Sequence, residues 1–156
     1  MTTKSKRPVS VYLSYAQKDK DLKEEFEDYL AIMQQNGLIS GWVERQVQRG
    51  TDWSQVIDPR ILTTDLVLVL VSPALLASGY SSGAELQKAF ERSETGETRV
   101  IPIILHYVNL IGYVLGRVQL LPRDAQPVSS WSNRSEAWEN IDRGIRRAID
   151  GITKHY

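Results

Sequence analysis

A single glutamate is the residue of this chain that is best placed for chemistry. The stretch SGYSSGAELQKAF, residues 78–90, contains Glu85. Residues 82–85 match S-x-x-E, the pattern of a capping box at the start of a helix. A capping box contributes about 1 kcal/mol of stability and no chemistry. The alternative is a catalytic carboxylate that the first turn of a helix presents to a cleft.

The composition argues against most other kinds of site. The chain has 156 residues and no cysteine, which excludes disulfides, thiolate metal sites and a cysteine nucleophile. Its two histidines, His106 and His155, are far apart in sequence, so neither a Ser-His-Asp triad nor a metal site is expected. Nineteen basic residues balance nineteen acidic ones, and nothing in that balance calls for a nucleic-acid or membrane partner. The glycine-rich motifs of Rossmann and P-loop phosphate sites do not occur.

Strand-like and helix-like patterns alternate along the chain. Residues 66–71 (LVLVLV) show no polar alternation, which is typical of a strand covered on both faces in a parallel sheet. We therefore predict an α/β, flavodoxin-like fold of three layers, with a five-stranded parallel sheet and helices on both faces. Predicted strands are 9–15, 38–43, 65–72, 99–105 and 127–131, and predicted helices cover 18–37, 53–61, 82–92 and 138–152.

Pro59 interrupts the second of these helices, so either the helix kinks there or Asp58 caps a new short helix with Pro59 at its first position. We expect one domain over residues 9–152, a flexible segment at 1–8 and a tail at 153–156. The longest apolar run is far shorter than a membrane span, and no signal peptide is evident, so a cytoplasmic location is expected.

Several segments, taken in order, resemble a known family. They are VYLSYAQKD, GWVERQVQRGTDW, LVLVLVSPALLASGYSSGAELQKAFE, RVIPIIL and PVSSW. Together they resemble a Toll/interleukin-1 receptor (TIR) domain of the bacterial type, over residues 9–149. No single segment is specific, but their order and combination are.

The resemblance implies an activity and a catalytic residue. Many bacterial TIR domains cleave the nicotinamide–ribose bond of NAD⁺, as glycohydrolases or cyclases that need no cofactor, in signalling or anti-phage defence. The catalytic glutamate of those enzymes, on the helix after the third strand, matches Glu85. Residues 44–52 correspond to the BB loop, which mediates self-association with other TIR domains, in homo-oligomers or filaments, and helps complete the site of a neighbouring copy.

The chemistry suits a site with one carboxylate. The nicotinamide of NAD⁺ is already cationic and leaves as a neutral base, so no general acid is required. The transition state develops oxocarbenium-like charge on the ribose, which a carboxylate stabilises electrostatically or captures covalently.

The resemblance also implies that residues near Glu85 bind the substrate. The loop after the first strand lines the nucleotide site in the family, although a plain strand-to-helix turn is the alternative. Trp42 could instead pack in the core, Arg45 could be a solvated loop charge, and Tyr80 could pack beneath the helix. The predicted substrate-binding residues are Ser14, Tyr15, Ala16, Gln17, Trp42, Arg45 and Tyr80.

Two other functions stay open at this level. The first is a non-catalytic TIR adaptor that assembles with other TIR domains. The second is a nucleoside-processing enzyme, similar to deoxyribosyltransferases, that also uses a glutamate on a related fold. Incubation with NAD⁺ or with nucleosides distinguishes them by the release of nicotinamide or of free base.

Overall fold

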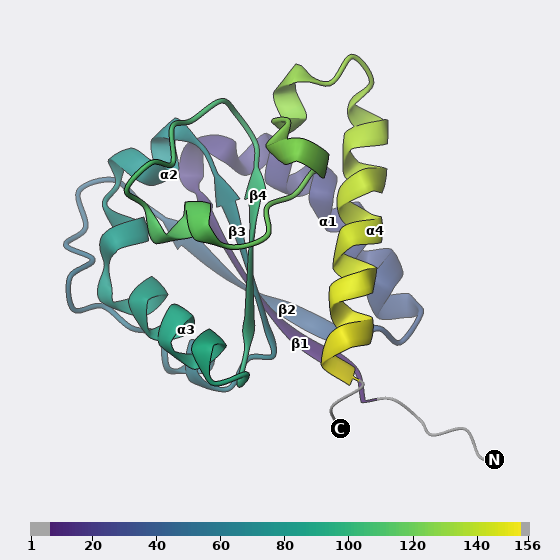
Figure 1. Cartoon of the computed structure of the whole chain (residues 1–156), viewed down its shortest axis with the longest axis horizontal. Coiled ribbons are helices and arrows are strands. Elements are labelled where there is room, and N and C mark those ends of the chain that lie inside the picture. Colours follow the sequence, from purple (N-terminus) through teal and green to yellow (C-terminus); the bar gives the residue numbers. More distant parts are fainter. Residues whose placement is uncertain (1–6, 154–156) are drawn as a thin grey trace.

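The computed structural model describes residues 7–153 and contains one parallel sheet. Within those residues the sheet has four strands in the order β2-β1-β3-β4, all parallel (Figure 1). The strands are β1 (Val9–Ala16), β2 (Ile39–Val47), β3 (Leu66–Val71) and β4 (Arg99–Ile104). This places β2 at one edge and β4 at the other, and the order reverses between β1 and β3.

Helices cover both faces of the sheet. The helices are α1 (Lys20–Gln35), α2 (Pro73–Ala77), α3 (Ala84–Glu94) and α4 (Arg134–Thr153). Helices α1 and α4 pack on one face, and α3 packs on the other (Figure 1). The predicted α/β architecture with helices on both faces is therefore confirmed.

The central strand β3 is buried on both faces of the sheet. Its six side chains are all fully buried. Leu66, Leu68 and Leu70 point into the core beneath α1 and α4, whereas Val67 and Val69 point, with Val71, into the core beneath α3. Because successive side chains of a strand point to opposite faces, a strand covered on both sides must be apolar throughout.

The fifth predicted strand, 127–131, is wrong. Val128–Ser130 form a 3-10 helix instead, so the described part of the chain has four strands. Pro127 has no N–H to donate to a ladder, and its carbonyl accepts bonds from the N–H and the hydroxyl of Ser130. Only the N–H of Ser129 reaches the end of the sheet, bonding the carbonyl of Leu105 at 3.0 Å. Local bonds thus replace strand pairing.

The region between β2 and β3 also differs from prediction. Strand β2 continues to Val47, so half of the predicted loop 44–52 is paired with β1. The predicted helix over 53–61 is wrong, and only Pro59–Leu62 form a short 3-10 helix. The Asp58 side chain caps it by accepting from the Arg60 N–H at 2.9 Å, with Pro59 in the first position, as one alternative predicted.

The two ends of the chain lie largely outside the described residues. Most of the predicted segment 1–8 and of the predicted tail 153–156 lies outside residues 7–153. Among the helices of that range, none combines the length and the apolar character that crossing a membrane requires.

Candidate functional site

Glu85 lies in the first turn of α3, with its side chain 1 % exposed. The capping box does not form, because the N-cap of α3 is Gly83 and no side chain bonds the helix end there. The negative carboxylate is nevertheless favoured by the positive end of the helix dipole. Glu85 instead directs its two oxygens toward the sheet and toward the segment before β3.

Four donors converge on the Glu85 carboxylate. Arg45 binds it with two prongs, Nε to Oε2 at 3.0 Å and Nη2 to Oε1 at 2.6 Å. The backbone N–H of Asp58 donates to Oε1 at 2.8 Å, and the Tyr80 hydroxyl donates to Oε2 at 2.5 Å. A buried carboxylate is stable only when it is paired and hydrogen-bonded, and this one is both. The carboxylate is therefore held in one position by β2, by α3 and by the segment between them.

Arg45 reaches Glu85 from the edge strand β2. The sheet register aligns Arg45 with Ser14 of β1, which sets its side chain on the face that α3 covers. The guanidinium also lies over the Trp53 ring, 5.2 Å from its centroid. Its hydrogen bonds to Glu85 raise the pKa of Arg45 above its ordinary value, so the guanidinium stays charged. The Arg45 side chain retains 20 % exposure and separates the carboxylate from solvent.

Tyr80 continues the network inward. Its hydroxyl lies 2.8 Å from Ser14 Oγ, and both residues are fully buried. Burial, followed by the charge of Glu85, raises the pKa of Tyr80 well above its usual value, so the phenol keeps its proton. Because Tyr80 has one proton and gives it to the carboxylate, Ser14 must donate to Tyr80. The result is a chain of hydrogen bonds from Ser14 through Tyr80 to Glu85 and Arg45.

Two residues beside Glu85 were not predicted from the sequence. The Tyr12 hydroxyl is buried near Glu85 without a hydrogen-bond partner, and burial first, then the Glu85 charge, raises the pKa of Tyr12. Tyr12 is two residues before Ser14 and therefore on the same face of β1, a signal that alternation carries. Asp58 contributes a backbone N–H, which no side-chain pattern reveals.

The predicted residues separate into groups. Ser14, Arg45 and Tyr80 gather around Glu85. Tyr15 and Trp42 point to the opposite face of the sheet, where both donate to the carboxylate of Glu44, at 3.2 and 3.3 Å. The two sets separate because side chains alternate between faces along each strand.

Ala16 and Gln17 lie at a third location, where they line the smaller of two adjoining cavities at the carboxyl ends of β1 and β3. The cavities hold about 180 and 420 Å³, and both are bordered by Lys18 and Arg49. This is the point where the strand order reverses, the usual place for ligands in such sheets. Two cationic side chains there favour an anionic group.

His106 lies at the larger of these cavities. Its Nε2 is 3.8 Å from Asp19 Oδ1, and Ser72 donates to the other oxygen of Asp19 at 2.5 Å. The carboxylate stands between the hydroxyl and the imidazole, so the imidazole is not placed to take a proton from Ser72. A nucleophilic triad is therefore not present at this cavity.

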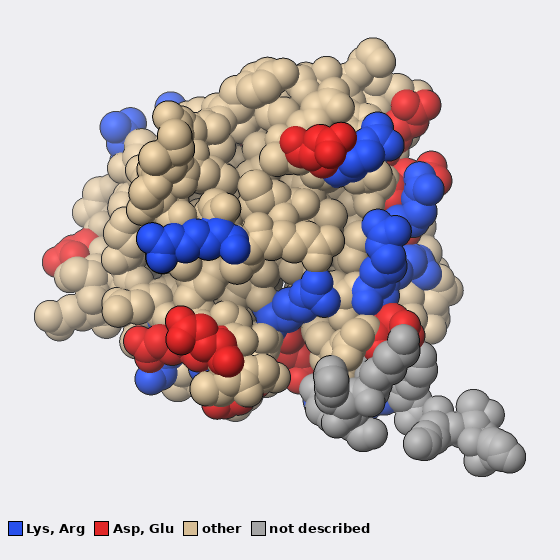
Figure 2. All heavy atoms as spheres, viewed as in Figure 1, with Lys and Arg blue, Asp and Glu red and all other residues tan. Residues whose placement is uncertain are grey.

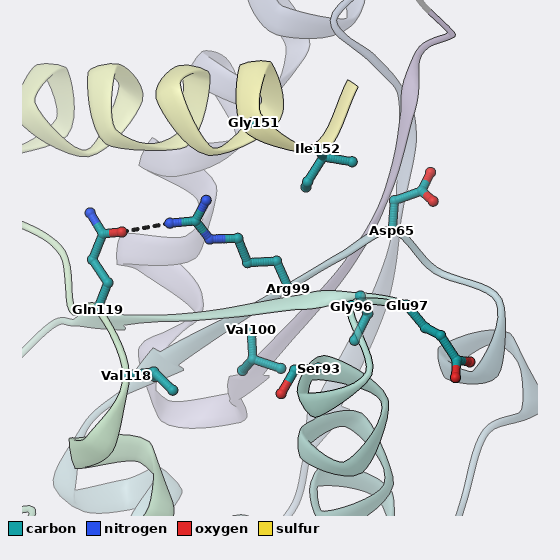
Figure 3. Close-up of a pocket in the computed structure, with 11 residues that line it drawn as sticks. Asp65, Ser93, Gly96, Glu97, Arg99, Val100, Val118, Gln119, Gly151 and Ile152 are labelled. Atoms are coloured by element: carbon teal, nitrogen blue, oxygen red, sulfur yellow. Dashed lines mark hydrogen bonds between the residues drawn. The ribbon is translucent and has the colours of Figure 1, made fainter. Parts of the chain in front are cut away.

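Other sites are not supported near Glu85. Over residues 7–153, no group of three His, Asp or Glu side chains is arranged to hold a metal ion. A cavity of about 560 Å³ lies at the opposite end of the strands, where Arg99 extends toward Gln119 (Figure 3). None of the predicted site residues lines it.

The comparison with protein families identifies the chain. The family model for the TIR domain matches residues 11–145. The chain belongs to the TIR domain family. This TIR domain is also similar to uncharacterized protein y4lF of Sinorhizobium fredii, with 34 % identity over 145 residues. That match covers 93 % of this chain and 45 % of the relative, so the chain spans less than half of the relative's length.

Proposed function

We propose that this TIR domain cleaves the nicotinamide–ribose bond of NAD⁺, with Glu85 as the catalytic carboxylate. The supporting observation is the Glu85 carboxylate, which is 1 % exposed and held by four donors at the end of the sheet where the strands present their carboxyl ends. The bond between ribose C1′ and the nicotinamide nitrogen breaks, and its electrons leave with the neutral nicotinamide. Glu85 stabilises the positive charge on the ribose until an oxygen of water, or an atom of the same nucleotide, forms the new bond to C1′; an attacking water loses one proton to solvent in this step.

The arrangement around Glu85 sets a condition on this reaction. With 1 % exposure and both oxygens bonded, the carboxylate cannot face a ribose while Arg45 is in place. Arg45 is the partially exposed member of the pair and lies on an edge strand, so it is the group that moves. Its release would uncover Glu85 and leave Asp58 N–H and Tyr80 to orient the carboxylate.

The neighbouring cavities favour a substrate that carries phosphate. Lys18 and Arg49 border the space at the strand reversal, where they would hold the diphosphate of NAD⁺. Ala16 and Gln17 would line the path between that space and Glu85, and the buried Ser14 would act through its bond to Tyr80. A role for Tyr15 and Trp42 would require substrate contact on the other face of the sheet, and that role stays a prediction.

The experiment is incubation of the purified chain with NAD⁺, followed by chromatography for nicotinamide, ADP-ribose and cyclic products. Wild-type protein should release nicotinamide, and Glu85→Gln should not, because the amide keeps the size of the side chain but lacks its charge. Glu91→Gln is the matched control, since Glu91 is an exposed glutamate on the same helix. Equal release by wild type and Glu85→Gln would refute the catalytic proposal.

A non-catalytic assembly module is the second candidate, and one observation favours it. The complete pairing of Glu85 with Arg45 and its neighbours is also what a structural ion pair would show. Under that function no variant and no concentration of the chain releases nicotinamide.

We propose self-association through residues 48–52, the exposed part of the predicted loop 44–52 that lies beyond β2, in bacterial signalling or anti-phage defence within the cytoplasm.

A further inference from the structure

A second cavity with cationic walls lies on the other side of the molecule, between α4 and the segment that precedes it. It holds about 410 Å³, and three guanidinium groups border it, those of Arg123, Arg143 and Arg147. Asp124 is the one acidic residue in its lining. Figure 2 shows Lys and Arg side chains gathered along the α4 side of this face. We call this cavity the arginine pocket.

The arginines of α4 are available to a ligand. Arg143 and Arg147 are four residues apart and therefore lie on the same side of the helix. Arg143 contacts Glu139 at 3.3 Å, but both side chains are more than 60 % exposed, and such exposed pairs are weak. Arg147 forms no ion pair with any other residue of the described range. Little must therefore be broken before these groups bind an anion.

The third arginine is held in place by the fold. The backbone N–H of Arg123 donates to Asn140 Oδ1 at 2.7 Å, which ties the segment to α4. Its guanidinium lies over the Trp131 ring at 5.2 Å. The next two residues, Asp124 and Ala125, have φ of 59° and 55°, a conformation that is unfavourable for L-residues. This costly turn orients Arg123 before any ligand arrives.

The helix and the segment approach each other closely enough to form a defined wall. A Cβ at Gly144 would lie 2.6 Å from Leu121 Cδ2, so a larger residue there would force the Leu121 side chain to move. Gly144 lies between Arg143 and Arg147, and Leu121 forms part of the pocket wall. The two guanidinium groups therefore flank a fixed apolar base.

We propose that the arginine pocket binds a small molecule that carries a phosphate or diphosphate group. Three guanidinium groups against one carboxylate require a ligand with at least two negative charges. The planar fork of arginine matches the geometry of phosphate oxygens in two-pronged bonds. We expect a free phosphate ester rather than a long polyanion, because the three arginines border one small, open concavity and the chain has no net charge to attract a polyanion. It does not depend on the reaction proposed for Glu85, which lies beneath the other face of the sheet.

The test is calorimetric titration of the whole chain with pyrophosphate at low ionic strength, repeated at high ionic strength. Binding should saturate in the millimolar range or below and weaken with salt. Arg147→Gln, Arg143→Gln and Arg123→Gln should each weaken it by about 10-fold or more, the usual effect of losing one charged hydrogen bond. Arg146→Gln is the matched control, because Arg146 is adjacent in sequence but pairs with Asp142 at 2.9 Å outside the pocket.

Three outcomes would overturn the proposal. The first is absence of saturable binding, and the second is equal weakening by Arg146→Gln and Arg147→Gln. The third is binding that persists in all three pocket variants, which would place pyrophosphate elsewhere, as at Lys18 and Arg49. A parallel titration with phosphatidylcholine vesicles containing phosphatidic acid distinguishes a lipid headgroup, and binding to vesicles without binding to pyrophosphate would also contradict the proposal.

Discussion

The contributions of Arg45 and Glu85 to the free energy of unfolding should be strongly coupled. Arg45→Ala leaves a carboxylate that is 1 % exposed with only the Asp58 N–H and the Tyr80 hydroxyl as donors. Removing one partner of a buried pair costs about 3–5 kcal/mol. Glu85→Ala should cost somewhat less, about 2–4 kcal/mol, because the remaining guanidinium is 20 % exposed and reaches water.

The double variant Arg45→Ala/Glu85→Ala contains neither charge. It should therefore be destabilised about as much as Arg45→Ala alone, so the magnitude of the coupling energy equals the cost of Glu85→Ala, about 2–4 kcal/mol. Urea unfolding of the four proteins, followed by far-ultraviolet circular dichroism and extrapolated to water, measures this energy. In a domain of this size each 1 kcal/mol lowers Tm by about 2–4 °C, so a thermal melt provides a second reading.

The chain contains a control ion pair that has the same two-pronged geometry and greater solvent exposure. Arg134 binds Glu25 with two prongs at 2.8 Å each, but the side chains are 53 % and 36 % exposed. Its coupling should stay below about 1 kcal/mol, since exposed pairs contribute little. If the Arg45 and Glu85 effects add within about 0.5 kcal/mol, or match the control pair, the account of a buried pair is refuted.

Three further results are expected. Gly83→Ala should destabilise the domain by about 1–3 kcal/mol in urea unfolding, because the added Cβ would lie 2.5 Å from the Trp53 carbonyl oxygen. The backbone is not the cause, since the φ of −84° at Gly83 suits any residue. An unchanged unfolding midpoint would contradict this contact. Asp58 accepts from Arg60, which lowers its pKa from 3.8 to about 2. Its contribution to stability should be complete above about pH 4 and lost as the pH falls toward 2, because the unfolded state takes up the proton first. The free energy of unfolding should thus fall less steeply from pH 5 to 2 in Asp58→Asn than in wild type. Parallel plots of this free energy against pH would disprove the linkage. If assembly completes the proposed site, nicotinamide release per molecule should rise with protein concentration. It should fall in Gly50→Pro, because Gly50 has φ of +92° and proline requires about −65°. Equal rates at all concentrations in wild type and variant would show that one copy suffices.

Local patterns were sufficient for the elements that are buried or amphipathic along their whole length. The unbroken apolar run of β3 predicted a central parallel strand, and the periodic isoleucines of 138–152 predicted α4. Glu85 was also placed correctly near the start of a helix that follows β3. These features follow from residue type and spacing, because burial selects apolar side chains at the period of the element.

Short segments with few apolar residues were predicted less well. Residues 127–131 have strand-like composition, but the bonds of Ser130 to the Pro127 carbonyl form a turn. Residues 53–61 have helical spacing, yet they form a turn, an irregular stretch and the start of a short 3-10 helix, and the bond from the Ala84 N–H to the Trp53 carbonyl ties the segment to α3. In both cases contacts with one neighbour outweighed a weak local preference.

The sequence alone determined that Glu85 is the carboxylate to consider, and only the tertiary structure decided what surrounds it. Arg45 and Glu85 are 40 positions apart, and their contact depends on β2 lying beside β1 in the register that aligns Arg45 with Ser14. A shift of one residue in that register would turn Arg45 to the other face of the sheet, where Trp42 and Tyr15 lie. Strand order and register arise from the packing of the whole core, so no local pattern near residue 45 or 85 contains them.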